Sequence, residues 1–334
     1  MIITCNADIR RIDYNKILSE IKEKGFEADI LRGLEKNQRP IIGLKGDCST
    51  IDTGDFLKLK GVSDVKRISN KYKLASREYN LEDTVVKLGN ISIGNGYDAV
   101  FMAGPCAVES EHQILRIAEE VKQQGAVILR GGAFKPRTYA RSFEGLGEEG
   151  LKYLKKAKEK TGLYIVTEVM SPETVELVSK YSDILQIGAR NMQNYDLLDK
   201  LGRQRKPVLL KRGITATIDE FLGAADRIML GGNNNVMLCL RGVRTFDNSQ
   251  RYPADLYAIP YLREKSHLPI VFDPSHATGK RSLVPSIAKM AIAGGVNGLL
   301  IETHYNPSEA KCDGAQMILS EEIGPLVRFA RNLK

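Results

Sequence analysis

The sequence predicts an α/β protein in which a (β/α)8 barrel of the TIM type follows a small α+β domain. Strand-like and helix-like segments alternate eight times after residue 98, and the strand-like segments are apolar almost throughout. Such runs are typical of parallel strands that are covered on both faces. The first seventy residues instead follow the order βαββαβ. We therefore expect three parts: a small domain (1–70), a linker with a hairpin (71–97) and the barrel (98–334).

The small domain is predicted from short segments that alternate in type. Its strands and helices are expected at Ile2–Cys5 (strand), Asp13–Lys24 (helix), Glu27–Leu34 and Pro40–Lys45 (strands), Thr53–Leu59 (helix) and Val65–Ser69 (strand). This order is that of a ferredoxin-like sandwich. A unit of this size has a small core, so we expect it to dock on another part of the protein.

The next segment combines a polar stretch with a hairpin signal. Residues 71–83 are mostly polar, which predicts a linker. Two short apolar runs, Val85–Leu88 and Ile91–Ile93, flank Gly89 and Asn90, residue types that favour tight hairpin turns.

The barrel is predicted from the number and spacing of its repeats. Its strands are expected at Ala99–Ala103, Val127–Arg130, Tyr164–Val169, Ile184–Ile187, Val208–Lys211, Val236–Leu240, Ile270–Asp273 and Leu299–Glu302. Helices fit between them, as at Glu111–Gln124, Gly147–Thr161, Glu173–Tyr181 and Ile218–Leu230. The repeats fill about the 250 residues that a TIM barrel needs. A doubly wound open sheet is the alternative, but it seldom uses eight consecutive units.

Composition limits the class of protein. Hydrophobic residues make up 43% of the 334 positions and charged residues 27%, as in soluble globular proteins. The net charge of +8 comes from Lys and Arg that mostly alternate with Glu, so a nucleic-acid partner is not expected. No apolar run reaches membrane-spanning length and the start lacks the layout of a signal peptide, so we expect a cytoplasmic protein with no membrane partner. Five dispersed cysteines argue against a disulfide framework.

Metal-ligand residue types follow three strands that close the barrel. Cys106 follows the first strand, His276 the seventh, Glu302 ends the eighth, and Asp313 lies in the loop beyond. Each alone has an ordinary structural explanation, but the ends of parallel barrel strands meet at one mouth. A thiolate, an imidazole and two carboxylates suit Mn²⁺, Fe²⁺, Co²⁺ or Zn²⁺. His304 and Cys312 are close enough in sequence to replace one of these ligands.

Cations follow other strands at the same mouth. They are Arg130, Lys135, Arg137, Arg190, Lys211 and Arg241. A single cation at a strand end can simply extend its charged group into water, but solvent exposure is a poor explanation for a set of this size. Arg forks match phosphate and carboxylate geometry, so the set favours a small polyanionic substrate. Nucleotide-binding signatures of the GxGxxG and GxxxxGK[ST] types are absent from the expected settings.

Eight motifs together resemble one enzyme family. They are AGPCAVES (103–110), LRGGAFKPRT (129–138), SFEGLG (142–147), QIGARN (186–191), LLKRG (209–213), RGVRTF (241–246), DPSHATG (273–279) and IETH (301–304). The chain resembles the type I-beta 3-deoxy-D-arabino-heptulosonate-7-phosphate (DAHP) synthases over the whole barrel. The first seventy residues are more loosely similar to the ferredoxin-like regulatory domain of some members.

The resemblance implies a reaction and roles for the site residues. The reaction is the condensation of phosphoenolpyruvate with erythrose 4-phosphate and water to DAHP and phosphate, the first step of the shikimate pathway. The implied metal ligands are Cys106, His276, Glu302 and Asp313, with Mn²⁺ as the first expectation. The implied phosphoenolpyruvate contacts are Arg190 and Arg241 for the phosphate and Arg130, Lys135 and Lys211 for the carboxylate side. Arg137 and Thr138 would bind the phosphate of erythrose 4-phosphate.

Lys135 is the expected proton donor to the developing alkoxide, while the metal would polarise the aldehyde carbonyl. We expect neighbouring Arg residues to disfavour the charge of Lys135 and make it a better acid. The chain departs from the family pattern at Tyr139, Ala140, Arg141 and Glu144, which concerns the aldehyde-phosphate contacts, and at Leu240. The small domain would bind tyrosine or phenylalanine as an inhibitor, or serve in a homotetramer.

Three other functions stay open. The first is the sister enzyme 3-deoxy-D-manno-octulosonate-8-phosphate synthase, which uses arabinose 5-phosphate and is disfavoured by Pro136. The second is another metal-dependent aldolase or isomerase that acts on a sugar phosphate, because fold alone does not determine chemistry. The third is a sensor that binds phosphate ligands without converting them.

Overall fold

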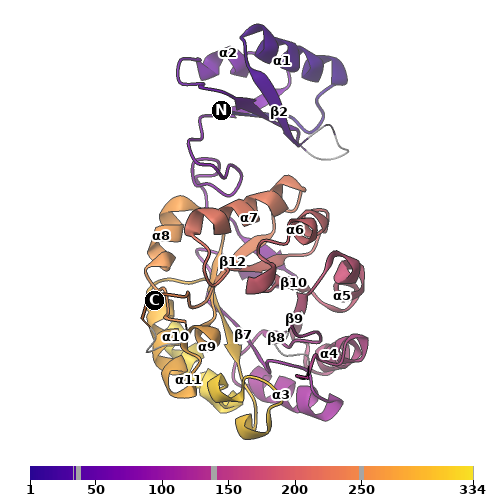
Figure 1. Ribbon diagram of the computed structural model, residues 1–334, viewed down its shortest axis with the longest axis vertical. Helices are drawn as coiled ribbons and strands as arrows, with labels where there is room; N and C mark the ends of the chain where they lie inside the picture. The colour runs from indigo at the N-terminus through magenta and orange to yellow at the C-terminus, as the bar shows by residue number, and fades with distance from the viewer. Residues whose placement is uncertain (33, 35–38, 137–140, 248–251, 334) are drawn as a thin grey trace.

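The computed structural model describes residues 1–334 apart from 33, 35–38, 137–140, 248–251 and 334. Within the described residues the chain forms a four-stranded sheet with two helices, a two-stranded hairpin and a closed eight-stranded barrel. The N-terminal domain lies beyond α7 (Ile218–Leu230) and α8 (Ala258–Lys265) at one end of the molecule (Figure 1). The predicted fold class is therefore confirmed. The expectations for Arg137, Thr138, Tyr139 and Ala140 lie outside the described residues.

The N-terminal domain has the predicted βαββαβ order. Its elements are β1 (Ile2–Cys5), α1 (Arg11–Glu23), β2 (Glu27–Arg32), β3 (Ile41–Lys45), α2 (Thr53–Leu57) and β4 (Val62–Lys66). The strand order is β2-β3-β1-β4 with antiparallel pairs throughout. Tyr14, Ile17 and Ile21 of α1 pack in the same apolar cluster as Ile3 and Ile42 of the sheet.

Strand β4 begins three residues earlier than predicted and ends three residues earlier. Gly61 has a φ of 92° directly before it, and the N–H of Val62 donates to the carbonyl of Leu59. This turn after α2 brings the chain onto β1 at once, so pairing starts at Val62.

The predicted polar linker is an ordered docking segment (residues 71–84) on the barrel. Asp226 of α7 (Ile218–Leu230) accepts hydrogen bonds from the backbone N–H groups of Lys73 at 2.8 Å and Ala75 at 3.0 Å. The N–H of Thr84 donates to the carbonyl of His267 at 2.8 Å. Leu74 is buried in the same cluster as the barrel core. The segment therefore fixes the chain to the barrel on the side of α7.

The predicted hairpin closes the N-terminal end of the barrel. It consists of β5 (Val86–Leu88) and β6 (Ile91–Ile93), which pair antiparallel. Val86, Leu88 and Ile93 belong to the apolar cluster that fills the barrel interior, together with Val100 and Ile184 at the starts of two barrel strands.

All eight barrel strands form within two residues of the predicted ends. They are β7 (Val100–Gly104), β8 (Ile128–Arg130), β9 (Tyr164–Val169), β10 (Ile184–Ile187), β11 (Val208–Lys211), β12 (Val236–Leu240), β13 (Ile270–Phe272) and β14 (Gly298–Glu302). Each pairs in parallel with the next, and β14 closes the barrel on β7. The helices are α3 (Glu111–Gln123), α4 (Glu148–Thr161), α5 (Val175–Tyr181), α6 (Tyr195–Gly202), α7, α8 (Ala258–Lys265), α9 (Pro274–Thr278), α10 (Val284–Ala293) and α11 (Ile323–Arg331). None of the described helices is long and apolar enough to cross a membrane.

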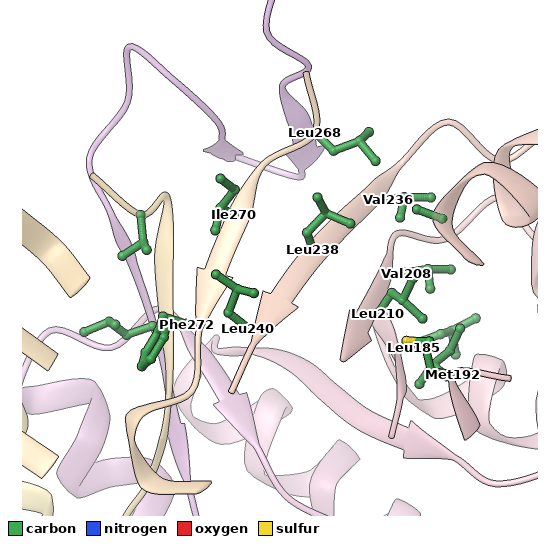
Figure 2. Packing of buried hydrophobic residues seen from close by; sticks show 14 of the residues in the cluster. Leu185, Met192, Val208, Leu210, Val236, Leu238, Leu240, Leu268, Ile270 and Phe272 are labelled. Atoms are coloured by element: carbon green, nitrogen blue, oxygen red, sulfur yellow. The ribbon is translucent and has the colours of Figure 1, made fainter. Parts of the chain in front are cut away.

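The strands separate two layers of side chains with a period of two residues. Leu238, Leu240, Ile270 and Phe272 belong to the large cluster that also contains the helix side chains, and part of this layer appears along β12 and β13 in Figure 2. The alternate positions, such as Leu209, Met237 and Val271, fill the interior. Two residues beyond its last interior apolar residue, every strand except β7 reaches a polar or charged residue at the C-terminal mouth; β7 has Gly104 at this position.

Candidate active site

A cavity of about 300 Å³ opens at the C-terminal mouth of the barrel. The predicted residues that line it are Arg130, Lys135, Arg190, Lys211, Arg241, His276 and Asp313. Cys106 and Glu302 are buried behind this lining. Cys106 contacts the lining residue Asp313, and Glu302 contacts the lining residue Arg130. The structure thus brings together every predicted site residue that it describes.

The four predicted metal ligands lie in two overlapping groups. Cys106, Cys312 and Asp313 form one group, and His276, Glu302 and Asp313 form the other. Within each group the potential ligand atoms lie within 4.8 Å of one another. Asp313 belongs to both groups, so a single ion between them would meet sulfur, nitrogen and oxygen donors. Of the two possible substitutes, Cys312 is in a group and His304 is in neither of those found among the described residues.

His276 is oriented by Asp273. Its Nδ1–H donates to Asp273 Oδ2 at 2.7 Å, which leaves Nε2 facing Glu302 Oε1 at 3.7 Å. A carboxylate behind the ring is the usual arrangement for a metal-ligating histidine. Burial lowers the pKa of His276, which favours the neutral imidazole that a metal needs.

Glu302 is buried at the end of β14 and is held by two donors. Arg130 Nη1 donates to its Oε1 at 2.9 Å and Gln316 Nε2 to its Oε2 at 2.6 Å. Burial raises the pKa of Glu302, but electrostatic interactions with His276, Arg130 and Lys135 lower it by more, to about 2. The carboxylate is therefore ionised at neutral pH.

Cys106 and Cys312 lie together on the other side of Asp313. Cys106 Sγ donates to Asp313 Oδ2 at 3.1 Å. A hydrogen bond with Cys312, burial and the charge of Glu302 raise the pKa of Cys106. A divalent cation would offset this, because coordination deprotonates a thiol outright.

Asp313 has a φ of 52°, in the left-handed region that non-glycine residues seldom adopt. The residue precedes the short turn η5 (Gly314–Gln316), whose Gln316 holds Glu302. Unusual backbone conformations of this kind cluster at functional sites. Here the conformation accompanies the shared position of Asp313 in both ligand groups.

Two buried arginine donors lack a partner at the cavity. Among the described residues, the Nε–H groups of Arg130 and Arg241 have no acceptor. Arg241 also lies over the ring of Tyr252, 4.9 Å from its centre, and burial lowers its pKa. Buried donors without acceptors are costly, so a bound anion would stabilise both groups.

The expectation that arginine neighbours make Lys135 a stronger acid is wrong for the structure. Burial lowers the pKa of Lys135, as does Arg130, but electrostatic interactions with Cys106 and Glu168 raise it by more. The net shift is upward, so the ammonium is stabilised. The ε-ammonium donates to the backbone carbonyl of Cys106 at 3.2 Å.

Sequence reasoning missed several residues of the mouth. They are Glu168, Gln186, Tyr252, Asp273 and Gln316. Glu168 and Gln186 follow the interior residues Val166 and Ile184 by two positions. A polar residue in register with an inward apolar one was therefore the available signal. Tyr252 and Gln316 lie in loops, where no such period exists.

Comparisons with known proteins agree over both domains. The profile of the DAHP synthetase I family matches residues 70–333, and the profile of the DAHP synthase ferredoxin-like domain matches residues 1–70. A phospho-2-dehydro-3-deoxyheptonate aldolase of Thermotoga maritima is 43% identical over 333 residues, which cover 100% of this chain and 97% of that protein. A 2-dehydro-3-deoxyphosphooctonate aldolase of Geotalea uraniireducens is 31% identical over 261 residues, which cover 73% of this chain and 95% of that protein.

Solved structures give the same result. The crystal structure of the DAHP synthase of Thermotoga maritima has a TM-score of 0.78 at 42% identity and covers 99% of this chain and 96% of that chain. A truncated form of the 3-deoxy-D-arabino-heptulosonate 7-phosphate synthase of Thermotoga maritima has a TM-score of 0.73 at 44% identity, over 78% and 96% of the two chains. The chain described here therefore belongs to the DAHP synthetase I family and is a transferase.

Proposed function

We propose that the protein condenses phosphoenolpyruvate with erythrose 4-phosphate and water to give DAHP and phosphate, in a reaction that depends on a divalent metal. The observation that carries the proposal is the composition of the mouth. Lys135, Lys211 and two arginines with unpaired buried donors face a cavity that also borders a sulfur, nitrogen and oxygen donor set. Fixed cations suit a small polyanion, and the donor set suits Lewis-acid chemistry.

The cations would bind phosphoenolpyruvate in a fixed orientation. Arg190 and Arg241 are proposed for its phosphate, and Arg130, Lys135 and Lys211 for its carboxylate side. Several cations in one cavity offset the repulsion between two anionic substrates and hold the reacting carbons together. Arg137 and Thr138 are proposed for the phosphate of erythrose 4-phosphate.

Cys106, His276, Glu302 and Asp313 are proposed to hold the metal, with Mn²⁺ first and Fe²⁺, Co²⁺ or Zn²⁺ as alternatives. The donor set fits such an ion, because a neutral imidazole, an ionised carboxylate and a thiol converge there. When bound, the ion supplies Lewis-acid polarisation of the aldehyde carbonyl.

Lys135 is proposed to give a proton to the alkoxide that forms at that carbonyl. Its raised pKa keeps the proton on Nζ at neutral pH, so it enters the reaction as the acid. The role no longer needs an unusually acidic lysine, because an alkoxide is a far stronger base than an amine.

The second candidate is 3-deoxy-D-manno-octulosonate-8-phosphate synthesis from arabinose 5-phosphate. It is kept because relatives named for that product share 31% identity with most of the barrel. Full-length identity of 43% to a protein named for the seven-carbon product favours the first candidate.

The test is phosphoenolpyruvate consumption by the purified protein after chelator treatment and Mn²⁺ replacement. Erythrose 4-phosphate and arabinose 5-phosphate are supplied in parallel. We expect metal-dependent loss of phosphoenolpyruvate with the four-carbon aldehyde. Loss only with the five-carbon sugar would support the sister reaction, and loss with neither would contradict both.

For the N-terminal domain we propose inhibition by tyrosine or phenylalanine within a cytoplasmic homotetramer. The ordered docking segment supports this, because it joins the domain to the barrel through backbone hydrogen bonds. Deleting residues 1–70 should abolish inhibition by both amino acids and leave synthesis intact. Sedimentation of the full chain and the deletion variant would test the tetramer. Inhibition that survives the deletion would contradict the proposal.

A further inference from the structure

Two buried ion pairs join the cations of the cavity to the residues around the proposed metal position. Arg130 Nη1 donates to Glu302 Oε1 at 2.9 Å, and Lys211 Nζ donates to Asp273 Oδ2. All four side chains are buried. The cations proposed for substrate are thus held by Glu302, a proposed metal ligand, and by Asp273, which orients the proposed ligand His276.

Asp273 contacts both a proposed metal ligand, His276, and a proposed substrate-binding cation, Lys211. It belongs to neither candidate ligand group found among the described residues. Its Oδ2 accepts from His276 Nδ1 at 2.7 Å and also from Lys211 Nζ. Its Oδ1 accepts from the backbone N–H of His276 at 2.9 Å, as the cap of α9. One oxygen therefore serves both the imidazole and the lysine.

A cation at His276 Nε2 would change the relative strength of the two hydrogen bonds that Asp273 Oδ2 accepts. It withdraws electron density from the ring, so Nδ1–H becomes a stronger, charge-assisted donor to Asp273. The same positive charge repels the ammonium of Lys211 at short range. Both effects weaken the hold of Asp273 on Lys211, whose side chain lines the cavity.

We propose that Asp273 is a positioning residue that couples metal binding to substrate-anion binding. It holds Lys211 when no metal is bound and releases it towards the carboxylate of phosphoenolpyruvate when a divalent cation occupies His276. The inference rests on the proposed function and adds a linkage between its two ligands. Because such linkage is reciprocal, the substrate anion must also tighten metal binding by the same factor.

The experiment measures the Mn²⁺ dissociation constant of the full chain by the paramagnetic resonance signal of free Mn²⁺. Titrations are run without and with saturating phosphoenolpyruvate, and the ratio of the two constants is the coupling factor. For the wild type we expect a factor within about 5 to 150, the usual range of such coupling. Asp273→Asn keeps the shape and the cap acceptor but removes the charge that holds Lys211, so the factor should fall by at least about threefold.

Asp255→Asn is the matched control. Asp255 Oδ2 accepts from Arg212 Nη1 at 2.7 Å, an acid–cation pair at the residue next to Lys211 that does not line the cavity. This variant should keep the wild-type coupling factor. An equal fall in both variants would overturn the proposal, since the effect would then reflect general loss of charge.

A second variant keeps the test decisive if Asp273→Asn is poorly folded, which its melting curve reveals. Lys211→Met removes the cation that Asp273 holds, so it should lose the same part of the coupling. Unchanged coupling in either variant would overturn the inference and leave the proposed function standing. A wild type that binds no phosphoenolpyruvate at any Mn²⁺ concentration would overturn the proposed function as well.

Discussion

The N-terminal end of the barrel is filled by apolar side chains and closed by the β5–β6 hairpin, whereas the C-terminal mouth of the same strands is filled by charged groups. Val86, Leu88 and Ile93 of the hairpin complete the interior cluster at one end. At the other end, Arg130, Lys211, Asp273 and Glu302 are buried in two ion pairs. The inward positions are continuous along each strand, so only the residue type changes.

Stability and chemistry are therefore separated along the barrel axis. Apolar burial at the hairpin end stabilises the fold, while buried charge pairs contribute weakly to stability and are disrupted at high cost. Variants at the two ends should therefore affect different measurements.

At the mouth, Cys106→Ala should lower metal-supported turnover by more than about 100-fold, because a proposed ligand is lost outright. The thermal unfolding temperature should change little, since Ala is also small and apolar. Turnover is measured as phosphoenolpyruvate consumption after metal replacement. Wild-type turnover in the chelator-treated variant would remove Cys106 from the proposed site.

At the hairpin end, Ile93→Ala should lower the free energy of unfolding by about 2–5 kcal/mol, the usual effect of emptying a buried aliphatic site. Ile93 is fully buried against the barrel interior. Substrate KM should stay near the wild-type value. Met290→Ala is the control, because Met290 is 56% exposed. If Ile93→Ala raises KM as strongly as it lowers stability, the two ends are not separate.

The hairpin turn offers a smaller effect with an internal control. Gly89 has a φ of 55°, and a Cβ there would lie 1.9 Å from the hydroxyl oxygen of Tyr164. Gly96 has a φ of 83° and open space around it. Gly89→Ala should therefore cost about 1–3 kcal/mol more than Gly96→Ala, whose effect is backbone strain alone. Equal destabilisation by urea unfolding would contradict the close contact.

The smallest expected effect is a pH dependence at the docking segment. His267 Nε2 contacts the carbonyl of Leu74 at 2.7 Å, and its Nδ1 contacts Thr84 Oγ1 at 2.7 Å. Burial lowers the pKa of His267 below its ordinary value of 6.5. Below pH 6.5 the unfolded chain therefore binds a proton that the folded chain does not, so stability is lost as the pH falls towards the folded pKa.

Urea unfolding between about pH 5 and 8 should show this loss in the wild type and a weaker one in His267→Gln. The difference between the two proteins isolates His267 from Asp226, whose pKa burial raises and whose contribution has the opposite sign. Parallel pH curves would contradict the assignment.

The sequence predicted the barrel well because its strands are continuously apolar and end at abrupt changes of residue type. Ile184–Ile187 and Val208–Lys211 have the expected bounds, and Thr53 begins α2 as predicted. The prediction for β4 is three residues too late because a turn at Gly61 determines where the strand starts. The pairing register with β1 is not contained in a pattern of residue propensities. The docking segment looked like a linker because its contacts are made by backbone groups with the distant Asp226 and His267.

Residue types at strand ends were enough to predict which groups share the mouth. They did not predict which cation pairs with which carboxylate, since partners such as Arg130 and Glu302 are 172 positions apart in the sequence. For the same reason the predicted direction of the pKa shift of Lys135 is wrong: the groups that raise it, Cys106 and Glu168, lie at the ends of other strands. Electrostatic environment depends on the closed barrel, which the local sequence does not describe.

A crystal structure of the full chain with Mn²⁺ and phosphoenolpyruvate, with the metal located by anomalous scattering, would show whether the mouth is the catalytic site. We expect one strong peak at bonding distance, about 2.0–2.4 Å, from Cys106 Sγ, His276 Nε2 and carboxylate oxygens of Glu302 and Asp313. The substrate anion should lie against Arg130, Arg241 and Lys211. A peak bound by other residues, or an anion outside this cavity, would contradict the assignment of the mouth as the catalytic site.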